Sequence, residues 1–213
     1  MNAIEQLISR QALRRTQAPL CPEFELWLAP EPVPLWETLE ALTGRREGPP
    51  FWAHAWPGSL ALARFVLDEP ALVSGQHVLD FASGCGVSAV AAVRSGAARV
   101  LATDIDPHAV SAMSVNASLN SCAFEASPRD VIGLDEAWDT VLVGDVFYQA
   151  GLSQRVLSWL QKLAHRGAAV LIGDPGRSFL PKEHLTAVST YPFTLNHAWD
   201  SVSDRPPSVW RLR

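Results

Sequence analysis

The chain has 213 residues, of which 48% are hydrophobic and 18% are charged. This composition excludes a disordered or collagen-like chain and is typical of a globular protein with one domain and an extension. No apolar run reaches the roughly 18 residues of a membrane span, so we expect a soluble protein with no membrane partner. A formal net charge of −5 offers no broad cationic surface for phosphate backbones, so we expect no nucleic-acid partner.

The cysteines and histidines show no metal-binding or disulfide pattern. Cys21, Cys85 and Cys122 are odd in number and lack the CxxC spacing of zinc sites. The histidines lack HxxxH and HxH spacing, so no metal is expected. Because free cysteines are typical of a reducing compartment, we expect a cytoplasmic protein, and we expect it to be a monomer.

Residues 1–50 are rich in proline, which interrupts helices and removes hydrogen-bond donors from strands. We therefore predict an N-terminal extension over 1–50 that wraps around the domain and lies outside its central sheet. Apolar residues at helical spacing predict one helix before Gln17, and we predict a second helix over Leu35 to Leu42.

From Phe51 onward, short apolar runs alternate with helical stretches, which is typical of a parallel sheet covered by helices on both faces. The predicted strands are His77 to Phe81, Arg99 to Asp104, a weak one near Ala123, Thr140 to Gly144, and Ala168 to Gly173. The predicted helices are Gly58 to Leu67, Ser88 to Arg94, Pro107 to Leu119, and Leu152 to Leu163. Leu185 to Tyr191 and Val209 to Leu212 are predicted as an antiparallel edge pair, so residues 51–213 form an α/β domain.

The first strand of this domain runs directly into a turn of small residues. The turn contains Ala82, Ser83, Gly84 and Gly86. Small residues let the backbone approach a ligand closely, and the N-terminus of the following helix offers unpaired N–H groups. The next strand ends in Asp104, whose carboxylate can accept hydrogen bonds from the hydroxyls of a ribose. The pattern predicts a nucleotide-like ligand.

Two kinds of nucleotide-like ligand are compatible with this pattern. A dinucleotide site uses the same architecture, but its G-x-G-x-x-G fingerprint is not met, because Ala82 and Ala89 stand at positions of that pattern. Asp80, just before the loop, is an acidic residue that a dinucleotide site lacks and that suits the amino group of S-adenosylmethionine. The sequence therefore favours S-adenosylmethionine as the cofactor.

Several segments resemble one enzyme family. Asp80 to Gly86, followed by Ala102 to Asp106, resembles the first motif and the ribose-binding acid of the seven-stranded S-adenosylmethionine-dependent methyltransferases. Four further segments resemble the protein lysine methyltransferases that modify the beta subunit of electron transfer flavoprotein, and these are Pro50 to Gly58, Val115 to Asn120, Gly144 to Tyr148, and Gly173 to Ser178. The resemblance covers most of residues 20–213. It implies a seven-stranded Rossmann-like sheet and a protein substrate, with the electron transfer flavoprotein beta subunit as first choice.

The resemblance also implies the residues that contact the cofactor. These are Trp56, Asp80, Ala82, Ser83, Gly84, Gly86, Asp104, Ile105, Asp130 and Asp145. Ala82 departs from the glycine usual in the family, and an alanine predicts a negative φ at this position. Asp130 resembles the loop acid that accepts a hydrogen bond from adenine N6, and an ordinary surface acid is its alternative role.

Asp145 and Tyr148 follow the strand Thr140 to Gly144, at the edge where parallel sheets place their ligands. A lysine must lose its proton before it attacks, and a carboxylate and an aromatic hydroxyl can orient the amine while water takes the proton. We therefore predict that both residues are catalytic, with a helix N-cap as the alternative role of Asp145. Val146 and Phe147 replace the prolines of adenine- and glutamine-modifying enzymes, which favours a flexible alkyl amine.

Two residue pairs have open roles. Trp52 and Trp56 either present an aromatic face to a cation, with Trp56 the better candidate, or pack as core residues. Asn116 and Asn120 share one face of a helix, where capping or hydrogen bonding between helix and sheet is favoured over a reach of Asn116 into the site.

Two other functions stay open beside lysine methylation of this substrate. One is methylation of ribosomal protein L11 or of a small-molecule amine, and the other is a donor-binding scaffold without turnover. A protein substrate predicts a lysine-wide channel open to the surface, whereas a small-molecule enzyme should close over its acceptor. The segment Asp174 to Ser178 has the Asp-Pro-Gly composition of a turn, and a substrate-gripping role for Asp174 or Arg177 is not favoured.

Overall fold

A computed structural model describes residues 2–192 and 205–213. Its central sheet has seven strands in the order β5 (Glu125–Ser127), β4 (Arg99–Thr103), β3 (His77–Phe81), β6 (Thr140–Gly144), β7 (Ala169–Asp174), β9 (Ser208–Leu212) and β8 (Leu185–Thr190). The strands from β5 to β7 are parallel, and β9 runs antiparallel to both β7 and β8. The predicted mostly parallel sheet with an antiparallel edge pair is confirmed. The predicted weak strand near Ala123 begins later, at Glu125.

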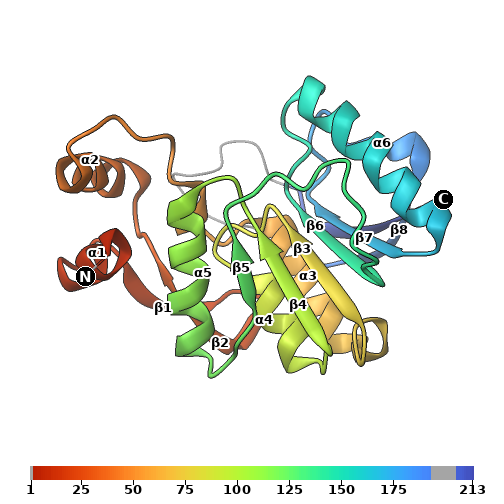
Figure 1. The fold of residues 1–213 in the computed structure, drawn as a ribbon, viewed down its shortest axis with the longest axis horizontal. Helices are drawn as coiled ribbons and strands as arrows, with labels where there is room; N and C mark the ends of the chain where they lie inside the picture. The colour runs from red at the N-terminus through yellow and green to blue at the C-terminus, as the bar shows by residue number, and fades with distance from the viewer. Residues whose placement is uncertain (1, 193–204) are drawn as a thin grey trace.

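Helices cover both faces of this sheet (Figure 1). They are α3 (Pro57–Asp68), α4 (Val87–Arg94) and α5 (Pro107–Leu119) on one side, and α6 (Ala150–Arg166) on the other. Neighbouring strand residues point to opposite faces, so Val78 packs with α3 and α4 while Leu79 packs with α6. None of the helices among the described residues is long and apolar enough to cross a bilayer.

Local sequence sets where these helices begin. Asp106 is the N-cap of α5 and accepts a hydrogen bond from the His108 N–H at 2.8 Å, and Pro107 occupies the first helical position. Pro57 likewise begins α3. Proline suits this position because its missing N–H would have no partner within the helix. The start of α5 is as predicted, and α3 begins one residue before the predicted Gly58.

The N-terminal extension contains α1 (Ala3–Ser9), β1 (Arg14–Ala18), β2 (Cys21–Leu28) and α2 (Pro32–Thr43). Strands β1 and β2 form an antiparallel hairpin outside the central sheet, and this hairpin was not predicted. Its prolines, Pro19 and Pro22, lie in the turn and at the start of β2. Proline is tolerated there because a two-stranded sheet has open edges where no ladder hydrogen bond is lost.

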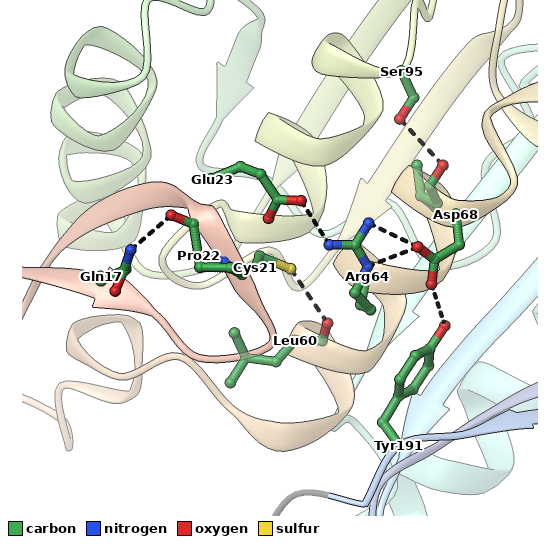
Figure 2. A network of polar contacts seen from close by, with 10 residues as sticks. Gln17, Cys21, Pro22, Glu23, Leu60, Arg64, Asp68, Ser95 and Tyr191 are labelled. Carbon is green, nitrogen blue, oxygen red and sulfur yellow. Dashed lines mark hydrogen bonds and ion pairs between the residues drawn. The ribbon is translucent and has the colours of Figure 1, made fainter.

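A polar network fixes the extension to the domain (Figure 2). Arg64 of α3 donates a hydrogen bond to Glu23 of β2 at 2.8 Å and forms an ion pair with Asp68 at 2.7 Å. Asp68 also accepts a hydrogen bond from the hydroxyl of Tyr191, just beyond β8. One helix therefore connects the extension to the far edge of the sheet.

Candidate active site

Two carboxylates brace the loop between β3 and α4. The buried Asp80 accepts hydrogen bonds through Oδ2 from the Ser83 hydroxyl and from the Ala89 N–H, the latter at 3.0 Å. Asp104, at the end of the neighbouring strand, accepts hydrogen bonds from the N–H groups of Gly84 and Asp106, each at 3.0 Å. The structure thus brings together the two acids that the sequence singled out.

Ala82 has a φ of +53°, so the prediction of a negative φ was wrong. The Ser83 N–H extends the ladder to the Thr103 carbonyl at 2.9 Å, and the chain then turns back, because the Ser83 hydroxyl donates to Asp80 and the Ser83 carbonyl accepts from the Gly86 N–H at 2.9 Å. A left-handed alanine costs about 1 kcal/mol relative to the right-handed region. Ala82 therefore occupies the conformation that glycine normally supplies, and the surrounding hydrogen bonds maintain it.

The loop leaves room for a ligand. A Cβ added to Gly84 would have only the Trp52 Cα within 4 Å, at 3.9 Å, so this part of the backbone faces open space. Beside it, the Ile105 side chain is 77% exposed although it is apolar. An open glycine backbone, a carboxylate and an exposed apolar side chain fit the sugar and the flat base of an adenosyl group.

Asp130 lies in the segment after β5. Its Oδ1 accepts a hydrogen bond from the Ile132 N–H at 2.9 Å, and its Oδ2 pairs with Arg155 at 3.4 Å. Both side chains of the ion pair are about half exposed, and exposed pairs of this kind contribute little. An adenine contact for Asp130 stays a prediction.

Asp145 is buried at the end of β6, with a φ of +56°. Its Oδ2 accepts a hydrogen bond from the Ser59 N–H at 2.9 Å, in the first turn of α3. Its Oδ1 accepts a hydrogen bond from Arg177 at 3.2 Å. The alternative role as N-cap of the following helix was wrong, because Gln149 is the N-cap of α6. Asp145 instead accepts an N–H from a helix that precedes it by more than eighty residues.

Close backbone packing places α3 against Asp145. A Cβ on Gly173 would lie 2.0 Å from the Gly58 carbonyl oxygen, and a Cβ on Gly58 would lie 2.1 Å from the Gly173 carbonyl oxygen. A Cβ on Gly144 would lie 2.2 Å from the Ser59 Oγ. Only glycine permits such an approach, and as a result the N-terminus of α3 meets the ends of β6 and β7.

The two tryptophans have different surroundings. Trp52 is 2% exposed and belongs to the hydrophobic core. Trp56 lies on the Asp145 side, where its Nε1 donates to the Phe51 carbonyl at 2.9 Å and its ring faces the Arg177 guanidinium, with Cζ 5.5 Å from the ring centroid. Tyr148 is 55% exposed, and its ring lies 6.4 Å from that of Phe51. The structure therefore places Trp56, Asp145 and Tyr148 on one side of the site.

Asn116 and Asn120 join α5 to the hairpin. Asn116 Oδ1 accepts a hydrogen bond from the Trp27 N–H at 2.7 Å, and its Nδ2 donates to the Cys85 carbonyl at 2.9 Å. Asn120 accepts from the Glu25 N–H at 3.1 Å and donates to the Glu25 carbonyl at 2.7 Å. The favoured reading, hydrogen bonding between helix and sheet, is confirmed. Asn116 also connects β2 to the loop before α4, a connection that the sequence did not predict.

Burial changes the acid strength of the carboxyl groups. Burial raises the pKa of Asp80 to about 7, against hydrogen bonds from Ser83 and Ala89 that lower it. Burial also raises the pKa of Asp145 to about 7, and the nearby Arg177 opposes this rise. Burial raises the pKa of Asp174 to about 6. These acids therefore change charge near neutral pH, which is typical of functional sites.

We expect the affinity for S-adenosylhomocysteine to fall as the pH drops from 8 to 6. The cationic amino group of this ligand is predicted to meet Asp80, and it should bind only the ionised carboxylate. The raised pKa of Asp80, about 7, makes the neutral form dominant below neutrality. The dissociation constant should rise about tenfold in total between pH 8 and pH 6, with most of the rise between pH 7 and pH 6. Calorimetric titrations at pH 8, 7 and 6 measure it. Asp80→Asn should bind weakly at every pH, and an unchanged pH dependence in Asp80→Asn would contradict this assignment.

The described residues form a small hollow beside the site and a larger one away from it. The smaller one, of about 130 Å³, lies against Arg177 and Arg205 at the turn after β7. The larger one, of about 630 Å³, lies where β7 begins, and residues such as Ala169 and Arg211 line it. It is therefore separate from the carboxylate cluster. Across residues 2–192 and 205–213, no group of three His, Cys, Asp or Glu side chains is arranged to hold a metal ion.

Solved structures share this fold. A ribosomal protein L11 methylase from Lactobacillus delbrueckii aligns with a TM-score of 0.50 and 20% identity, over 71% of this chain and 76% of that one. A magnesium protoporphyrin IX methyltransferase from Synechocystis, solved with S-adenosylmethionine bound, aligns with a TM-score of 0.53 and 16% identity, over 73% and 77%. The chain therefore has the fold that these methyltransferases share, with the braced loop at the carboxyl ends of β3 and β4.

Sequence relatives specify the family. The chain is 36% identical to the electron transfer flavoprotein beta subunit lysine methyltransferase of Xenopus laevis over 207 residues, which are 94% of this chain and 83% of the relative. The human protein of the same name is 42% identical over 162 residues, 74% of this chain and 61% of that protein. The family model of ribosomal protein L11 methyltransferase (PrmA) matches residues 61–145. The chain belongs to the electron transfer flavoprotein beta subunit lysine methyltransferase family, and S-adenosylmethionine is its cofactor.

Proposed function

We propose that this protein methylates lysine side chains of the electron transfer flavoprotein beta subunit. The observation that carries the proposal is the cluster of Asp145, Trp56 and Tyr148 at the end of β6, beside the cofactor loop. A carboxylate and aromatic faces suit an alkyl ammonium or amine. The names of the relatives supply the particular substrate.

The residues of the loop would hold the cofactor. Asp104 would accept hydrogen bonds from the ribose, Asp80 would face the amino group, and Ile105 would pack on the base. Ser83, Gly84 and Gly86 form the backbone of this cradle. When bound, the cofactor supplies a methyl group on a positively charged sulfur, which keeps the electron pair of the broken C–S bond.

Asp145 and Tyr148 would act on the acceptor lysine. Its amine must be neutral, because the nitrogen lone pair forms the new N–C bond, and its proton passes to water. Asp145 is held from two sides, by Ser59 and by Arg177, so its carboxylate can orient the amine without moving. Orientation of this kind accounts for much of the rate in displacement reactions.

Methylation of ribosomal protein L11 is the second candidate. The matching family model covers only residues 61–145, which run from α3 to the end of β6. This region contains the cofactor loop, whereas the segments around Phe51 and Arg177 lie outside it. The match therefore supports binding of the cofactor but does not identify the acceptor protein. The identity of the acceptor rests on relatives that align over most of the chain.

We also propose a monomer in a reducing compartment such as the cytoplasm, without nucleic-acid or membrane partners. The net charge of −5 supports the absence of a nucleic-acid partner. Cys21 and Cys85 are buried as free thiols, which supports a reducing compartment.

Incubation with isotope-labelled S-adenosylmethionine tests the substrate. We expect methyl groups on lysines of the purified electron transfer flavoprotein beta subunit, located by mass spectrometry of its peptides. Ribosomal protein L11 serves as the comparison substrate and should remain unlabelled. Labelling of L11 alone would establish the second candidate, and absence of any label in a host lysate, with the cofactor bound, would support a scaffold without turnover.

A further inference from the structure

Arg177 lies in the site, although its sequence context predicts only a turn. It follows β7 in a turn that Asp174 holds, since Asp174 Oδ1 accepts hydrogen bonds from the Gly176 and Arg177 N–H groups, each at 2.7 Å. Gly176 has a φ of +89°, which turns the chain back toward the sheet. The Arg177 side chain is 11% exposed, so the turn directs it inward.

The guanidinium lies between an aromatic ring and a carboxylate. Its Nη2 is 3.2 Å from Asp145 Oδ1, and its Cζ is 5.5 Å from the centroid of the Trp56 ring. The Asp145 side chain is 6% exposed, so little water reaches the ion pair. A buried carboxylate without a cation would take up a proton instead of remaining charged.

We propose that Arg177 is a positioning residue for methyl transfer, which keeps the Asp145 carboxylate ionised and directed toward the acceptor amine. The proposal rests on the proposed function in one respect, because it takes Asp145 as the group that meets the amine. Arg177 itself does not touch the reacting atoms. Loss of its charge should make Asp145 neutral at physiological pH, and a neutral carboxyl group cannot orient the amine as a carboxylate does.

The charged groups around Asp145 support this role. On the β7 side are Arg177 and Asp174, which act in opposite directions, because the negative charge of Asp174 disfavours ionisation of Asp145. Lys182 partly balances Asp174. On the other sides are the Ser59 N–H from α3 and the Cys85 thiol from the loop before α4. Among these described groups, Arg177 is the cation that contacts Asp145.

Carboxyl titration of Asp145 tests the proposal. ¹³C NMR of the cofactor-free protein follows this group, and the signal is assigned by its loss in Asp145→Asn. We expect Arg177→Gln to raise the pKa of Asp145 by about one pH unit or more above the wild-type value of about 7. Arg177→Lys keeps the charge and should keep the wild-type titration. Arg99→Gln, which removes an exposed arginine paired with Glu125, is the matched control and should change nothing.

The pH profile of kcat/KM gives the second measurement. Arg177→Gln should lower kcat/KM about fivefold or more at pH 7, with recovery toward wild type at pH 9, where Asp145 is ionised again. An unchanged titration of Asp145 in Arg177→Gln, or an equal loss of activity at every pH, would overturn the proposal. So would a gain in activity, since Arg177 would then block the acceptor position.

Failure of the role of Arg177 and failure of the proposed substrate give different results. The carboxyl titration needs no methylation, so it remains decisive if the proposed substrate proves wrong. If Arg177→Gln does not fold, as judged by its melting temperature, Arg177→Lys decides the question. A rise of about one pH unit in the pKa of Asp145 in Arg177→Lys would show that the positive charge is not what sets this pKa.

Discussion

Asp145→Asn should reduce lysine methylation by about 10² to 10⁴ in kcat/KM while the cofactor still binds. The amide has the shape of the carboxylate, so the Ser59 N–H keeps an acceptor. The negative charge that orients the amine is lost. Cofactor affinity should remain within about twofold, because Asp80 and Asp104 brace the cofactor loop independently. Single-turnover methylation assays and calorimetry with S-adenosylhomocysteine measure the two effects separately.

Asp139→Asn provides the matched control for this variant. Asp139 also accepts a backbone hydrogen bond, from the His77 N–H at 2.8 Å, but it lies at the opposite end of β3 and β6. Its replacement should leave both activity and cofactor binding unchanged. Full activity in Asp145→Asn would contradict the catalytic role, and a parallel loss of cofactor affinity would show that Asp145 acts mainly as a cofactor contact, the other role that the resemblance implies for it.

Gly173→Ala should destabilise the fold by about 3 kcal/mol or more, which corresponds to a melting temperature lower by roughly 6 to 12 °C. The added Cβ would lie 2.0 Å from the Gly58 carbonyl oxygen and 2.7 Å from Leu62 Cγ, so α3 must move away from β7. This movement should also separate the Ser59 N–H from Asp145. Thermal unfolding followed by circular dichroism measures the stability, and the methylation assay measures the site.

Gly151→Ala is the control for glycine replacement. Gly151 lies in the first turn of α6, and a Cβ there meets nothing within 4 Å. Alanine has the higher helix propensity, so the stability should rise by less than about 1 kcal/mol. If Gly173→Ala unfolded at the same temperature as Gly151→Ala, the close approach of α3 and β7 would not be a constraint on the fold.

The functional residues differ in how far the sequence could reveal them. Asp80 is the next-to-last residue of β3 and Asp104 directly follows β4, and adjacent parallel strands necessarily bring their ends together. Arg177 carries no such signal, because an Asp-Pro-Gly turn predicts only a change of direction. Its partner Asp145 is 32 residues away in the chain, and the contact exists because β6 and β7 are neighbours in the sheet.

The elements with local signals can be predicted from the amino-acid sequence alone. Asp106 and Pro107 start α5 through groups within one turn, and alternation of apolar runs and helices specifies the parallel sheet with its cofactor loop. Tertiary structure alone decided the left-handed conformation of Ala82, the hairpin β1–β2 and the position of Arg177. Each of these features contacts a distant segment: Thr103 bonds to the loop after β3, Asn116 and Asn120 bond to β2, and Asp145 bonds to Arg177. The free energy of these contacts is absent until the chain has packed.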